Sequence, residues 1–155
     1  MKIDFTQRIE ASPEQILNVL VDHNNLSRFF NAKISTITEQ NSDEIVGGKG
    51  TVRLIKIGPI SFKEQVLIAN NEHFSYKIIG KGPVSEHQGD IYLKQSSNEY
   101  DNVVTDLHYI ITCKAPFFIP DGLAKYFIEK DIKLAMKNIA EYFTRQIANK
   151  LESQK

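Results

Sequence analysis

The sequence contains no tryptophan and only one cysteine, Cys113. A single cysteine excludes an internal disulfide and a cysteine-rich metal site. No apolar run reaches the roughly 18 residues that a membrane-spanning helix needs, so we expect no stable membrane insertion. The segment from Met1 to Gln7 also lacks the apolar core of a signal peptide. These absences predict a reduced, cytoplasmic protein.

An excess of charge of one sign is also missing. Lys and Arg together number 19, Asp and Glu together number 19, and the formal net charge is zero. Nucleic-acid binding needs a clustered positive excess, so we do not expect nucleic acid as the main partner. No short metal-ligand spacing occurs, and we predict neither a metal site nor a cofactor. The four histidines stand apart at His23, His73, His87 and His108.

Two segments, one rich in glycine and one apolar, allow more than one interpretation. The segment Gly47–Gly50 contains a lysine, but it lacks the spacing and the following helix of a phosphate-binding loop, so we interpret it as a turn. Phe117, Phe118 and Ile119 stand in a linker before the last helical segment. We favour a hydrophobic staple that seats the helix. The alternatives are a cover over one end of a cavity and a patch that faces a membrane or a partner.

The C-terminal segment from Asp121 to about Lys150 has the strongest pattern in the chain. Its apolar residues recur at helical spacing, which predicts one amphipathic helix of roughly 45 Å. They are Leu123, Phe127, Ile128, Ile132, Ala135, Met136, Ile139, Tyr142, Phe143 and Ile147. With 155 residues, 41% hydrophobic and 25% charged, we expect one globular domain over residues 1–155.

The rest of the chain predicts mainly strands. Ser12 and Gln15 form a capping box around Pro13, so a short helix follows a first strand at 3–10. A second short helix would begin at Asn24 or Asn25 as its cap. Short turns then separate strands near 34–37, 51–57, 60–69, 73–79, 84–94 and 103–114. Strands joined by short turns indicate an antiparallel meander.

Alternation along the strands predicts which side chains look toward the core. Ser75 should face outward, and in residues 103–113 the more apolar set should face inward. A one-residue bulge there would exchange the two sets and bring Asp106 and His108 inside. The predicted inner set is Phe62, Glu64, Val66, Ile68, Phe74, Tyr76, Ile78, His87, Gly89, Ile91, Leu93, Thr105, Leu107, Tyr109, Ile111 and Cys113.

Several phrases, taken in order, resemble the START-like superfamily, and most of all its polyketide cyclase/dehydrase-like (SRPBCC) members. They are Ile9–Ile16, Val21–Asn24, Gly50–Arg53, Phe62–Val66, Phe74–Ile78, Gly82-Pro83 and Gly89–Leu93. The resemblance implies an α+β helix-grip fold, with about seven curved antiparallel strands around the C-terminal helix and a cavity between them. It also implies a small hydrophobic ligand, since members bind lipids, hormones or polyketides and a minority catalyse. Family sequences often carry a Trp on the last strand, which this chain lacks.

Glu64 is the leading candidate in such a cavity, because a carboxylate among apolar neighbours must be paired or protonated. It could act as an acid or base or anchor a ligand hydroxyl or amine, or it could pair with Arg53 at the sheet rim. His87 could share a proton with Glu64 or polarise a ligand carbonyl. A bond from His87 to a backbone carbonyl is the plainer alternative. Tyr76 and Tyr109 would each seek a partner for a buried hydroxyl, although core packing alone also accounts for them.

Three functions follow as hypotheses. The first is binding of a lipid, polyketide or aromatic metabolite. The second is a cyclase, dehydratase or hydrolase that uses Glu64 or His87 as general acid or base. The third, drawn from coenzyme Q-binding relatives, is a lipid carrier with exposed Phe117, Phe118 and Ile119. The predicted ligand contacts are Phe29, Phe62, Glu64, Tyr76, His87, Tyr109, Phe127 and Ile128. The sequence leaves the oligomeric state open.

Overall fold

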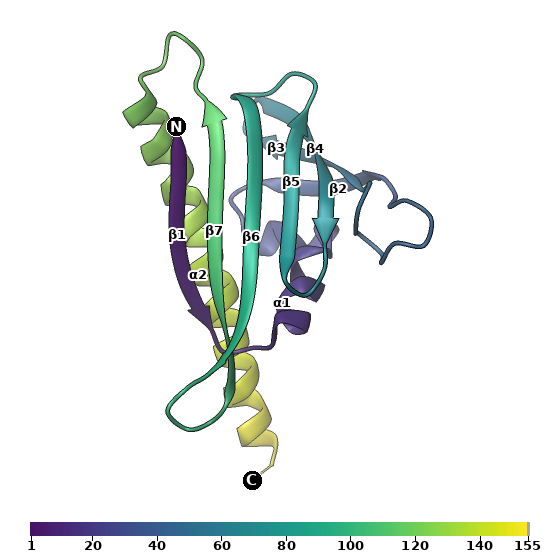
Figure 1. The fold of residues 1–155 in the computed structure, drawn as a ribbon, viewed down its shortest axis with the longest axis vertical. Helices are drawn as coiled ribbons and strands as arrows, with labels where there is room; N and C mark the ends of the chain where they lie inside the picture. Colours follow the sequence, from purple (N-terminus) through teal and green to yellow (C-terminus); the bar gives the residue numbers. More distant parts are fainter. Residues whose placement is uncertain (155) are drawn as a thin grey trace.

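A computed structural model describes residues 1–154, which form one antiparallel sheet, a long C-terminal helix and two short helices after the first strand (Figure 1). The seven strands lie in the order β1-β7-β6-β5-β4-β3-β2. The predicted α+β helix-grip architecture is therefore confirmed. The elements are β1 (Lys2–Ile9), α1 (Pro13–Leu20), the 3-10 helix η1 (His23–Arg28), β2 (Lys33–Thr38), β3 (Val52–Ile57), β4 (Ile60–Ala69), β5 (His73–Ile79), β6 (Ser85–Ser97), β7 (Val103–Lys114) and α2 (Asp121–Ser153).

The start of α1 has the predicted capping box. The backbone N–H of Gln15 donates to the Ser12 hydroxyl at 3.2 Å, and the Ser12 N–H donates to the Gln15 side chain at 2.8 Å. The second short helix is present as predicted, but its predicted cap is wrong, because η1 begins at His23 with Asp22 as its N-cap. Asn24 instead accepts a hydrogen bond from the Thr36 N–H at 2.9 Å, which ties η1 to β2.

The predicted inner face of β7 is confirmed. Leu107 and Tyr109 are buried, while Asp106 and His108 bond to Arg8 and Asp4 of the neighbouring strand on the outer face. The ladder between β1 and β7 runs without a register shift, so the bulge that would have exchanged the two faces does not occur there.

A register shift between β4 and β5 overturns the inner-face prediction for Ile68. The register between these strands shifts after Val66, so that Val66 pairs with Tyr76 but Ile68 pairs with Ser75. The extra residue turns Ile68 away from the apolar face, where it is 38% exposed. Ser75, which we predicted to face outward into solvent, is the cross-strand partner of Ile68. Its side chain is nevertheless buried.

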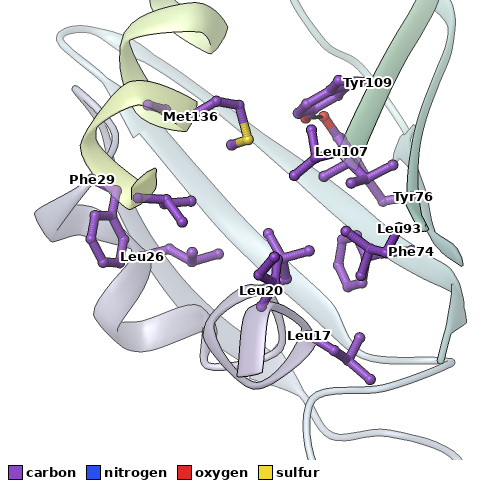
Figure 2. Close-up of a cluster of buried hydrophobic side chains, with 14 of the residues drawn as sticks. Leu17, Leu20, Leu26, Phe29, Phe74, Tyr76, Leu93, Leu107, Tyr109 and Met136 are labelled. Carbon is purple, nitrogen blue, oxygen red and sulfur yellow. Dashed lines mark hydrogen bonds between the residues drawn. The ribbon is translucent and has the colours of Figure 1, made fainter. Parts of the chain in front are cut away.

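Only the middle of α2 packs tightly. Its buried residues are Ala135, Met136, Ile139 and Phe143. They meet side chains from α1, from the η1 region and from the sheet, and Figure 2 shows this cluster with Met136 facing Leu107 and Tyr109. Leu123 and Ile147, near the two ends of the predicted apolar stripe, are substantially exposed. At 33 residues and about 1.5 Å per residue, the helix is longer than the core it covers.

The connection that leads into α2 does not form the predicted staple. Phe117 and Phe118 are exposed, and only Ile119 is half-buried. Pro120, the N-cap residue, makes no side-chain capping bond. Among residues 1–154, no helix is both long and apolar enough to cross a bilayer.

Candidate functional site

A buried ion pair joins Arg53 on β3 to Glu64 on β4. These residues are register partners, and the Arg53 Nε and Nη2 atoms lie 3.0 and 2.8 Å from the Glu64 Oε1 atom. Their side chains are only 8% and 9% exposed. The predicted alternative that Glu64 pairs with Arg53 is thus confirmed, although the pair lies inside the molecule rather than at the sheet rim.

His23 is the third member of this cluster. Its Nε2 atom lies 2.7 Å from the Gly47 carbonyl oxygen, and its Nδ1 atom lies 3.2 Å from Arg53 Nη1. A carbonyl only accepts, so Nε2 carries the proton and Nδ1 accepts from Arg53. Burial, with the nearby Arg53 charge, lowers the pKa of His23 to about 4, which keeps the ring neutral near pH 7.

His23 was not among the residues predicted for the site. His23 and Arg53 are 30 residues apart, and no periodic pattern connects them. The glycine turn before β3 holds the His23 ring through the Gly47 carbonyl, and Gly47 has φ of 78° and packs against Val21 at the end of α1. A Cβ atom at Gly47 would lie 2.0 Å from the Val21 carbonyl oxygen. The glycine at this position is the one signal that a close backbone approach was required.

Tyr76 and Tyr109 form a second buried pair, and their hydroxyl groups share a hydrogen bond. Their strands, β5 and β7, are separated by β6, where Gly89 lies opposite Tyr76. Because Gly89 has no side chain, the Tyr76 ring can cross over it. Burial raises the pKa of both phenols, so both remain protonated. The Arg53 guanidinium carbon lies 4.9 Å from the Tyr76 ring centroid, which connects the two pairs.

His87 lies at the edge of this cluster and is half-buried. Its ring centroid is 5.5 Å from that of Tyr76, and its Nδ1 atom accepts a hydrogen bond from the Ile78 N–H at 3.2 Å. The backbone partner is therefore an amide and not the carbonyl that we considered. Burial lowers the pKa of His87, so the neutral ring carries its proton on Nε2 as a hydrogen-bond donor.

The predicted apolar contacts are distributed unevenly. Phe62 is buried two residues before Glu64 on the same face of β4. Phe29 is buried elsewhere in the core, edge-on to Tyr142 of α2 at 5.6 Å between ring centroids. Ile128 is half-buried, whereas Phe127 is 56% exposed. Phe127 is thus not brought to the other predicted residues, since the helix turns Ile128 toward the core instead.

Surface hollows lie elsewhere. One is on the outer face of the sheet near Tyr92 and His108, and another lies between Ala11 and the Phe143 region of α2. Neither is lined by Arg53, Glu64 or their partners. Within residues 1–154, no group of three or more His, Cys, Asp or Glu side chains is arranged to hold a metal ion. Arg53, Glu64, His23, Tyr76 and Tyr109 are thus buried polar groups in the sheet–helix core, and they lie outside these two hollows.

Comparison with known proteins supports the fold and nothing finer. No family model and no curated protein sequence matches the chain. A START superfamily protein from Mycobacterium smegmatis superposes with a TM-score of 0.75 at 10% identity, covering 94% of this chain and 98% of that one. The protein XoxI from Bacillus cereus gives 0.69 at 17% identity, covering 92% and 95%. An uncharacterised protein from Bacillus thuringiensis gives 0.66 at 17% identity, covering 93% and 99%. The chain therefore has the START-like, helix-grip fold.

Proposed function

We propose that this protein binds a small, largely hydrophobic molecule between the inner face of the sheet and α2, with the polar end of the molecule at Glu64. One observation carries the proposal. Both Arg53 contacts go to Glu64 Oε1, and no donor among residues 1–154 is in hydrogen-bonding geometry with Oε2. The fully buried side-chain oxygens without a partner belong to Thr51 and Ser75, and Glu64 Oε2 is not among them. A donor on the ligand would supply the partner for Oε2.

The energetics of the pair support a functional role. Burying two charges costs several kcal/mol per ion by general experience, and well-packed apolar residues usually stabilise a core as well or better. Leu and Met at these two positions would therefore stabilise the fold about as well as the ion pair does. A few convergent polar groups in an apolar setting are typical of ligand sites.

The available donors and acceptors define the ligand chemistry. Glu64 Oε2 accepts, so the ligand would present a hydroxyl or an amine to it. His87 Nε2–H donates, so a ligand oxygen would suit it. Phe62 and the apolar core next to it would contact the hydrocarbon part. A lipid, polyketide or aromatic metabolite with a hydroxyl group meets these requirements, and the START-like fold supports this class of ligand.

Native mass spectrometry of freshly purified protein tests the proposal most directly. We expect an adduct of defined mass on the wild-type chain. The variant Arg53→Met/Glu64→Leu removes both charges while keeping similar volume, and it should lose the adduct yet remain folded. Arg8→Met/Asp106→Leu is the matched control, because that Arg–Asp pair lies on the outer face at 2.9 Å. A wild-type chain without any adduct, or a double variant that keeps it, would contradict the proposal.

An enzyme is the second candidate, and the free Oε2 atom favours Glu64 as its acid or base. His87 is less suited to act as a base because its Nδ1 atom already accepts from Ile78. Glu64→Gln separates the two functions. A binding protein would keep most of its adduct, whereas acid–base catalysis on an identified ligand would fall by about 100-fold or more.

A lipid carrier is a narrower form of the binding proposal. It requires exposed apolar residues before α2, and Phe117 and Phe118 are 101% and 71% exposed. Ile119, the third predicted residue, is half-buried and therefore only partly exposed. This exposure supports the carrier form without identifying a lipid.

A further inference from the structure

The end of the molecule that holds the β7–α2 connection exposes an unusual group of large apolar side chains. Phe117 is fully exposed and Phe118 is 71% exposed. The first turns of α2 add Leu123, Tyr126 and Phe127, each about half exposed. Exposed apolar residues are ordinary when scattered, but a contiguous group on one segment marks an interaction surface.

Two other connections lie at the same end of the strands, which we call this edge of the sheet. In an antiparallel meander alternate turns lie at the same end, so the β3–β4 and β5–β6 turns lie where β7 ends. Figure 1 shows the β5–β6 turn and the β7–α2 connection at one end, near the N-terminus. Ile57 and Ile60, which flank the β3–β4 turn, are 39% and 46% exposed.

Charge is polarised toward this edge although the whole chain is neutral. The segments 54–63, 77–85 and 113–127 contain six lysines and one acidic residue, Asp121. All six lysines are exposed: Lys56, Lys63, Lys77, Lys81, Lys114 and Lys125. One of them, Lys114, pairs with Glu86 just beyond the second segment. At the opposite edge, the turns 70–73 and 98–102 hold three acidic residues and no Lys or Arg.

We propose that this end, defined by the segments 54–63, 77–85 and 113–127, docks on the surface of an anionic lipid bilayer. Aromatic and aliphatic side chains enter the interfacial layer, while lysines contact the anionic head groups. The charge distribution favours a bilayer over a second copy of this chain, because two lysine-rich ends repel each other. The exposed side chains of this surface are not members of the buried Arg53–Glu64 cluster, and its docking does not depend on the proposed ligand.

Vesicle co-sedimentation tests the docking. We expect the full chain to bind vesicles of phosphatidylcholine with phosphatidylglycerol, to bind phosphatidylcholine alone far less, and to be released by added salt. Phe117→Ser/Phe118→Ser should weaken binding by about tenfold or more. The matched control is Tyr100→Ser, an aromatic that is 76% exposed in the β6–β7 turn at the opposite edge.

Charge reversal at the lysines tests vesicle binding independently of the phenylalanine variants. A lysine near an anionic surface strengthens binding roughly fivefold, so Lys56→Glu/Lys81→Glu should weaken it by at least about tenfold. Lys94→Glu/Lys150→Glu makes the same charge change away from this end and should have a small effect.

The absence of tryptophan supplies a direct readout of insertion. Phe117→Trp should show a blue-shifted emission on anionic vesicles, and Tyr100→Trp should not. Equal binding by all variants, or no binding by the wild-type chain, would overturn the proposal. So would a dimer in light scattering that Phe117→Ser/Phe118→Ser dissociates while vesicles have no effect, since the occupant would then be a second copy.

Discussion

Tyr76 and Tyr109 share a hydroxyl–hydroxyl hydrogen bond although β6 separates their strands, and Gly89 is the residue that permits it. A Cβ atom at Gly89 would lie 2.5 Å from Tyr76 Cζ and 2.7 Å from its hydroxyl oxygen. Two aromatic residues on non-adjacent strands therefore meet because the strand between them presents no side chain. This arrangement places the Tyr76 ring beside Arg53, whose guanidinium carbon is 4.9 Å from the ring centroid.

Gly89→Ala should destabilise the fold by roughly 1–3 kcal/mol, because the added methyl group must displace the buried Tyr76 ring. Urea denaturation of the two proteins measures the loss. Gly122→Ala is the control, since no atom lies within 4 Å of the position its Cβ would take. A loss no larger than that of Gly122→Ala would show that the ring moves aside without cost.

Removal of one tyrosine hydroxyl should cost about 1–2 kcal/mol, because the other hydroxyl is left buried without its partner. Tyr76→Phe and Tyr109→Phe should each show this loss in the free energy of unfolding. The double variant should lose less than the sum of the two, since it leaves no unpaired hydroxyl. Strict additivity in this cycle would mean that the two groups do not interact.

Arg53→Met alone should destabilise the protein by roughly 3–5 kcal/mol, because it leaves the Glu64 carboxylate buried without its counter-charge. Arg53→Met/Glu64→Leu should recover most of that loss and reach a stability close to or above the wild type. Chemical denaturation at pH 7 compares the three proteins. A double variant as unstable as the single one would indicate that the pair itself is needed for the fold.

His23 should make the stability depend on pH. Its pKa is about 4 in the folded protein, against an ordinary value of 6.5, so the unfolded chain binds the proton first. Stability is thus fully present above pH 6.5, falls as pH decreases through the window from 6.5 to about 4, and falls no further from this cause below it. A shift of this size corresponds to roughly 3 kcal/mol.

His23→Gln isolates this effect, because Gln can donate to Gly47 and accept from Arg53 without titrating. The variant should lose much of the pH dependence between pH 4 and 6.5 that the wild type shows. Asn25→Gln, at an exposed position in the same 3-10 helix, should keep it. If wild type and His23→Gln have parallel stability profiles across this window, the neutral buried state of His23 is excluded.

Part of the candidate site could be predicted from residue patterns. Strand alternation placed Glu64, Tyr76 and Tyr109 on the inner face, and the need of a buried carboxylate for a partner led to Arg53 as an alternative. His23 and Phe127 show the limit of that reasoning. His23 reaches Arg53 only because the glycine turn folds back over α1, and Phe127 lies on a part of α2 that extends beyond the core.

The sequence alone determined the order of the elements, the capping box at Ser12, the inner face of β7 and the extent of α2. These features depend on the local periodicity of strands and helices and on short-range hydrogen bonds, which neighbouring residues specify. Only the tertiary structure decided where the register shifts at Val66, which groups meet Arg53, and how much of α2 is covered. Those features depend on contacts between residues distant in the chain, and no local pattern encodes such distances. The collection of exposed lysines and phenylalanines at one edge is likewise a product of the sheet topology.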